Sequence, residues 1–259
     1  MSKTPRTSGT SASVAVRHTA LCTGLLLVAA AAAWAWVVLR WGGTGSGAMV
    51  EPPLPFLGTW TVMMAAMMLP GTAPVASLYA RTVTVHRAPR TLAFAVGYVL
   101  VWAAAGIPAY ALAVGTAEVA TRHPAAGTTV AAAIFAINGV YQLTPLKDRC
   151  LTTCRSPIGH LLRYASYRGP LRDLRAGAHH GAYCLGCCWS LMLLLAAFGV
   201  MNVWAMVGLA LVVVAEKQLP GGLRIARVVG IVSLALAVAV FWMPALAPGL
   251  TGGGDMTEM

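Results

Sequence analysis

Long uncharged stretches alternate with short charged clusters along the whole chain. The uncharged stretches are Thr19–Leu39, Pro52–Ala80, Thr91–Ala117, Pro124–Leu146, Ala176–Ala215 and Val228–Gly254. A transmembrane helix needs about 20 consecutive apolar residues. The pattern therefore predicts an all-α fold, a polytopic transmembrane helical bundle with one span for each stretch of ordinary length.

The fifth stretch is too long for one span. Even its core, Ala182–Ala215, has 34 residues, which as one helix would extend about 50 Å. The hydrocarbon core of a bilayer is only about 30 Å thick. We expect the chain to fold back near Gly199–Asn202, which gives seven spans, whereas a single projecting helix gives six.

The basic residues indicate the orientation. Lys and Arg gather before Thr19, between Ala80 and Thr91, and most densely between Leu146 and Ala176, while the intervening loops carry only Arg40 and Arg122. Positive loops stay on the cytosolic side. We expect a cytosolic N-terminus and a cytosolic Leu146–Arg175 loop. A fold-back near Gly199 also places the basic residues after Ala215 inside, which favours seven spans.

The composition agrees with a membrane protein. The chain is 58% hydrophobic and 10% charged, against about 25% charged residues in soluble domains. The net charge is +11. We interpret the basic residues as setting the membrane topology and contacting anionic lipid headgroups, not as binding nucleic acid. We expect a polar tail at 1–18, one transmembrane domain at 19–248 with a basic cytosolic loop at 146–180, and a flexible tail at 249–259. The first apolar stretch, longer than a signal-peptide core and bordered by tryptophans, is interpreted as a retained helix.

Five of the six cysteines lie close together in the sequence, and three of them follow a histidine pair. Positions three and four apart share a helical face, so one stripe holds His180, Cys184, Cys187, Cys188 and Met192, with His179 beside it. Imidazole, thiolate and thioether are ligands for soft metals. The alternative is that the cysteines only pack, which is our interpretation of Cys22.

A second pair, Cys150 and Cys154, has helical spacing as well. We expect the flanking Lys147, Arg149 and Arg155 to lower the thiol pKa values. Because the predicted location is cytosolic and reducing, stable disulfides are not expected. The alternative is a basic turn with incidental cysteines.

Methionines crowd the second apolar stretch. Met64, Met67 and Met68 share a helical face, Met63 lies beside them, and Pro70 is expected to kink or break the helix. Thioethers favour Cu(I) over harder ions. Met192, Met201 and Met206 in the cysteine-bearing stretch strengthen the ligand interpretation over that of adaptable core filler.

Acidic residues are few, and none is expected deep in a span. Glu216 and Lys217 are expected to pair with each other at a span's edge. Without buried carboxylates, proton-coupled antiport and transport of Mg²⁺ or Mn²⁺ are disfavoured. Hydrolase and ATPase motifs are missing from the sequence, so the sequence favours a protein that is not an enzyme.

Several segments in order resemble a bacterial family of predicted metal-binding integral membrane proteins, a domain-of-unknown-function family. The matching pieces are Met63–Pro70, Tyr141–Lys147 with Cys150 and Cys154, His180-Gly181 with Cys184, Gly186–Trp189 with Met192, Gly199 with Met201-Asn202, and Glu216-Lys217. The resemblance implies a metal-binding role in the bacterial cytoplasmic membrane.

The leading hypothesis is a membrane protein that handles a soft metal, with copper as Cu(I) preferred and zinc as the alternative. The expected partners are the lipid bilayer and a metallochaperone or metalloprotein. Two rival hypotheses remain: a membrane thiol–disulfide oxidoreductase that uses Cys150/Cys154 and Cys184/Cys187, and a structural or assembly subunit whose cysteines only pack.

Overall fold

The protein is almost entirely helical. The computed structural model describes residues 8–41, 51–83, 86–156, 159, 163–164, 166–200 and 202–251. The elements are α1 (Ser8–Trp41), α2 (Pro53–Thr82), α3 (Arg87–Arg122), α4 (Pro124–Gln142), α5 (Pro145–Arg155), α7 (Arg172–Phe198), α8 (Val203–Gln218), α9 (Gly222–Ala239), η1 (Pro244–Leu246) and α10 (Pro248–Thr251). The predicted all-α fold is confirmed.

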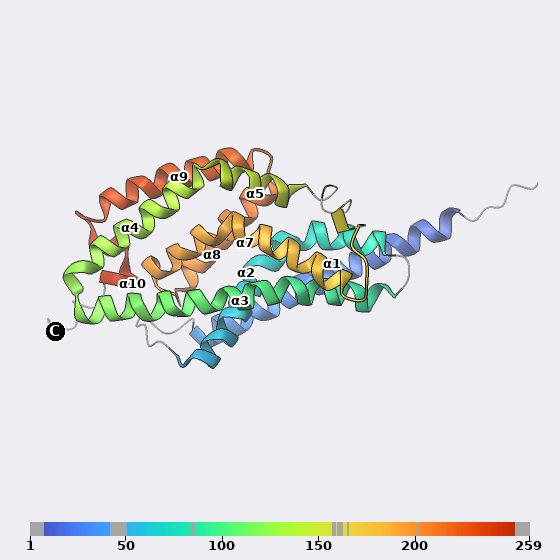
Figure 1. Ribbon diagram of the computed structural model, residues 1–259, viewed down its shortest axis with the longest axis horizontal. Helices are drawn as coiled ribbons and strands as arrows, with labels where there is room; N and C mark the ends of the chain where they lie inside the picture. The colour runs from blue at the N-terminus through green and yellow to red at the C-terminus, as the bar shows by residue number, and fades with distance from the viewer. Residues whose placement is uncertain are drawn as a thin grey trace, which may run out of the picture.

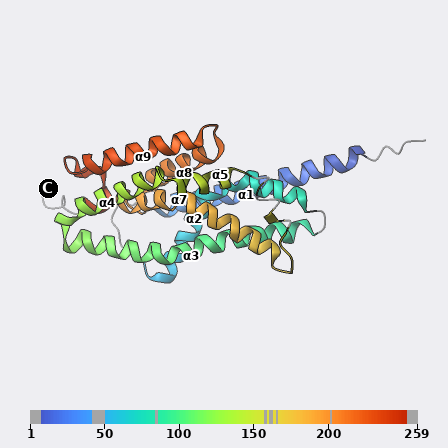
Figure 2. The same cartoon turned by 45° about the horizontal axis from the view of Figure 1, so that its top comes forward.

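The helices form an elongated bundle with α7 near its middle (Figure 1). Helix α7 packs against α3, α4, α5 and α8, while α2 packs against α1, α3 and α8. Helices α4 and α9 lie side by side along one flank in both views, and α1 extends beyond the other helices at its N-terminal end (Figures 1 and 2). Helices α2 and α7 thus each pack against several other helices of the bundle.

Five of the described helices are long and apolar enough to cross a membrane: α1, α2, α3, α7 and α9. Helices α4 and α5 meet at a bend of 64° and add a sixth candidate if they form one broken span. Helix α8, with 16 residues, is shorter than the roughly 20 residues of a regular span. The apolar helices fit a multi-pass membrane protein. By length and apolarity the described helices give five or six candidate spans, not the predicted seven.

The chain folds back between α7 and α8, as the length of the fifth apolar stretch predicted. Helix α7 ends before Gly199, whose φ of 98° lies in the left-handed region that glycine adopts without strain. The Asn202 side chain then caps α8 by accepting a hydrogen bond from the Ala205 N–H at 3.1 Å. Because Lys217 at the far end of α8 reaches Cys184 of α7, the two helices run antiparallel.

Pro70 was expected to kink or break the span, and helix α2 does not break there but continues through both of its prolines. Pro74 has no N–H to donate to the Pro70 carbonyl oxygen four residues earlier. Gln218 at the end of α8 supplies a replacement, since its Nε2 donates to that oxygen at 3.0 Å. The proline-containing part of α2 is thereby tied to α8.

Close backbone packing joins α3 and α7. A Cβ on Gly177 would collide with the Phe94 carbonyl, and a Cβ on Gly97 would collide with the Leu174 carbonyl. Small residues at such contacts let helices approach closely, as in membrane bundles. The segment expected to be a basic loop at 146–180 therefore contains most of α5 and the packed beginning of α7.

Candidate functional site

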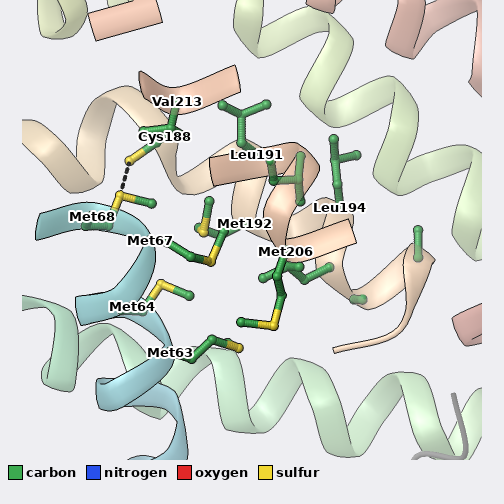
Figure 3. Packing of buried hydrophobic residues seen from close by; sticks show 14 of the residues in the cluster. Met63, Met64, Met67, Met68, Cys188, Leu191, Met192, Leu194, Met206 and Val213 are labelled. Atoms are coloured by element: carbon green, nitrogen blue, oxygen red, sulfur yellow. Dashed lines mark hydrogen bonds between the residues drawn. The ribbon is translucent and has the colours of Figure 1, made fainter. Parts of the chain in front are cut away.

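The four methionines of α2 are all enclosed. Met63 is 2% exposed and Met64, Met67 and Met68 are 0% exposed. Their side chains point from α2 towards α7 and α8, where Met192 and Met206 lie opposite (Figure 3). Met206, which is 1% exposed, joins this group from α8, whereas Met201 lies outside the described residues.

The three cysteines of α7 face the interior, as their helical spacing predicted. Cys184, Cys187 and Cys188 are each at most 1% exposed. The Cys188 Sγ lies 3.9 Å from the Met68 Sδ, a contact that Figure 3 shows as a dashed line. The Cys187 Sγ lies 3.8 Å from the Cys154 Sγ. Sulfur atoms from α2, α5 and α7 therefore meet in one buried region, which we call the sulfur cluster: Met68, Cys154, Cys184, Cys187 and Cys188.

Two polar side chains that the sequence interpretation missed contact Cys184. The Lys217 Nζ donates to the Cys184 Sγ at 2.9 Å, and the Tyr98 hydroxyl lies 3.0 Å from the same sulfur. Lys217 comes from the end of α8 and Tyr98 from α3. The Cys184 thiol is therefore bracketed by an ammonium group and a phenol.

The two cysteines of α5 occupy different environments. Cys154 is buried against α7, while Cys150 is half-buried, and its sulfur lies beside Gly186, where a Cβ would be 3.1 Å away. Burial raises the pKa of the Cys150 thiol, and the nearby Cys187 adds to this effect more than Lys147 opposes it. The expectation of a lowered pKa at Cys150 was therefore wrong, because desolvation outweighs the neighbouring positive charge.

The two histidines diverge. The His180 ring is buried and stacks between Phe94 and Tyr98, at centroid distances of 6.1 and 5.8 Å. The His179 ring instead lies by Arg163, with 3.1 Å between Nε2 and the guanidinium, and against Tyr183. His180 thus lies one turn from Cys184 beside the sulfur cluster, and His179 lies on another face of α7.

A buried ion pair adjoins the cluster. The Lys147 Nζ lies 2.6 Å from a Glu216 carboxylate oxygen, with side-chain exposures of 0% and 1%. The same ammonium donates to the Cys187 carbonyl oxygen at 2.5 Å, and the Gln142 amide donates to the other Glu216 oxygen at 2.9 Å. Glu216 therefore pairs with Lys147 of α5 and not with its neighbour Lys217, contrary to the sequence expectation.

The thiols and the thioether of the sulfur cluster lie close together in the described part of the chain. No group of three or more His, Cys, Asp and Glu side chains there is arranged to hold a metal ion. The sulfur cluster instead joins Cys187 to Cys154 and Cys188 to the thioether of Met68. A soft monovalent ion needs fewer ligands than tetrahedral zinc and accepts thioethers as well as thiolates.

A family model described as "PpoB2: Copper chaperone" matches residues 57–240. The comparison with curated proteins and the comparison with solved structures each returned no match. The matched segment contains the methionines of α2, the cysteines of α5 and α7, and the end of α8.

Proposed function

The chain belongs to the PpoB2 copper chaperone family, and from this premise we propose that it is a multi-pass membrane protein that binds Cu(I) through buried sulfur ligands and passes it to a partner. The partner is a metallochaperone or metalloprotein that accepts the ion. Copper is the cargo of this function, and each step is an exchange between ligands of similar softness.

The contact between Cys188 and Met68 carries the proposal. It joins two groups that would otherwise be separate, the cysteines of α7 and the methionine row of α2. Methionine alone is a common core filler, and buried cysteine alone behaves as a small apolar residue. Here a thiol contacts a thioether, and a thiol–thiol contact lies beside them. An ion bound to one of these sulfurs can therefore move to the next soft ligand in a single exchange.

The proposed roles follow the ligand types. Cys184, Cys187 and Cys188 form the tighter site, with the His180 imidazole one turn away. Cys154 and Cys150 accept or donate the ion at α5, where the half-buried Cys150 is the more exposed of the two. The thioethers of Met63, Met64, Met67 and Met68 form a weaker row, to which Met192 of α7 and Met206 of α8 contribute.

The proposed setting is the bacterial cytoplasmic membrane, with the N-terminus and the α5 region on the cytosolic side. The asymmetry of Lys and Arg between alternate loops supports this orientation. On that side thiols remain reduced, which keeps them available as ligands. Copper is favoured over zinc by the family and by the thioethers.

In the redox alternative Cys150/Cys154 and Cys184/Cys187 exchange disulfides. The contact of 3.8 Å between the Cys154 and Cys187 sulfurs joins one member of each pair across two helices. A packing-only role predicts that the thiols bind no ion. Both alternatives are outcomes of the experiment below.

The test is the copper content of full-length protein purified in detergent and loaded with Cu(I) under reducing conditions. We expect stoichiometric copper in the wild type and its loss in the combined variant Cys184→Ser, Cys187→Ser, Cys188→Ser, because a protonated hydroxyl is a hard donor that replaces a thiolate poorly. The control Cys22→Ser should bind as the wild type does. Stoichiometric copper in the triple variant would refute the proposed site, and a Cys154–Cys187 disulfide in protein from cells would favour the redox alternative.

A further inference from the structure

The ammonium group of Lys217 reaches into the sulfur cluster. The Lys217 Nζ contacts the Cys184 Sγ at 2.9 Å, and in the portion of the chain that is described Lys217 has no salt bridge to a carboxylate. The nearest acidic residue in sequence, Glu216, points elsewhere and pairs with Lys147. The charge of Lys217 therefore acts on whatever occupies the sulfur cluster.

Contacts with α2 and α5 hold the end of α8, and with it the Lys217 ammonium, in position. The lysine stem lies over Gly71 of α2, where a Cβ would come within 3.3 Å of the Lys217 Cδ. The next residue, Gln218, is bonded to the Pro70 carbonyl at 3.0 Å. Arg155 donates to the Leu219 carbonyl at 2.7 Å. Lys217 thus enters the cluster from a backbone that α2 and α5 hold in place.

We propose that Lys217 determines the charge selectivity of the sulfur cluster, so that it admits a monovalent soft cation and disfavours a divalent one. The inference rests on the proposed function and adds the basis on which Cu(I) is preferred to Zn²⁺. Thiolates alone do not separate the two ions, since both bind cysteine sulfur tightly. A fixed ammonium does, because it repels a dication twice as strongly as a monocation at the same distance.

The neighbouring charges do not cancel this effect. Lys147 is neutralised by Glu216, and within the described residues no carboxylate forms a hydrogen bond with a thiol of the cluster. Thiolates together with one ammonium carry less net negative charge than thiolates alone. A dication gains less from such a site, and because the three α7 thiols are at most 1% exposed, water screens the repulsion there only in part.

The test is a competition between Cu(I) and Zn²⁺ for full-length protein in detergent, under a reductant and in anaerobic buffer. We expect Lys217→Leu and Lys217→Gln to lower the ratio of Cu(I) affinity to Zn²⁺ affinity by about tenfold or more, mainly through tighter zinc binding. Lys217→Arg keeps the charge and should keep a ratio near that of the wild type. Arg224→Gln removes an exposed charge outside the cluster and should also leave the ratio unchanged.

A ratio within about twofold of the wild type in folded Lys217→Leu or Lys217→Gln protein would overturn the inference, because it would show that the ammonium exerts no charge discrimination. An equal fall of the affinity ratio in Lys217→Arg would also overturn the inference, since the effect of the substitutions would then be steric. A wild type that binds no Cu(I) would instead refute the proposed function itself. The two failures are therefore distinguishable.

Discussion

At the scale of single residues, substitution of the α2 methionines distinguishes a ligand role of these side chains from a packing role. Replacing Met63, Met64, Met67 and Met68 with Leu keeps the volume and apolarity of these buried side chains. Such swaps usually cost less than about 1.5 kcal/mol each. We predict that the fourfold variant folds with a modest loss of thermal stability in detergent, while copper delivery in cells falls because leucine has no thioether.

The matched control for this variant is Leu69→Met, a buried change on the same helix that adds a thioether instead of removing one. It should leave copper delivery intact. If the fourfold leucine variant delivered copper at the wild-type level, the methionines would be core filler and only the cysteine site would remain in the account.

The cysteine stripe could be predicted from residue spacing, but its polar neighbours could not. Cys184, Cys187 and Cys188 are buried together because positions three and four apart share a helical face. Glu216 and Lys217 were expected to pair because they are adjacent, yet adjacent residues of a helix do not face each other. Lys217 therefore reaches Cys184, while Glu216 reaches Lys147. These partners depend on how the helices pack against each other, and the local sequence pattern of one helix does not predict that packing.

At the scale of helices, length and apolarity predicted the main elements and the fold-back at Gly199. The α5 segment was expected to be part of a basic loop, although the spacing of Cys150 and Cys154 within it was interpreted as helical. Its start nevertheless carries sequence signals, since Pro145 follows Thr144, whose side chain accepts from the Lys147 N–H. Helix α2 was expected to kink or break at Pro70, and it does not break there. The bond from Gln218 to the Pro70 carbonyl comes from another helix, so sequence alone could not supply it.

At the scale of the whole molecule, the orientation in the membrane decides which compartment the sulfur cluster serves. We predict that a reporter fused at Arg168, between α5 and α7, is active only as a cytosolic reporter, because this region carries the densest positive charge. Paired cytosolic and exported reporters at the same position provide the control. An exported signal at Arg168 would reverse the orientation and place the thiols on the oxidising side.

The central claim is that buried sulfur side chains hold Cu(I). Copper X-ray absorption of the loaded, full-length protein tests it most directly, because the spectrum reports the atoms bound to the metal. We predict Cu(I) with a first shell dominated by sulfur at roughly 2.3 Å, the length of a metal–thiolate bond. This shell should disappear in the combined serine variant of Cys184, Cys187 and Cys188. A shell made only of nitrogen and oxygen in the wild type would contradict the account.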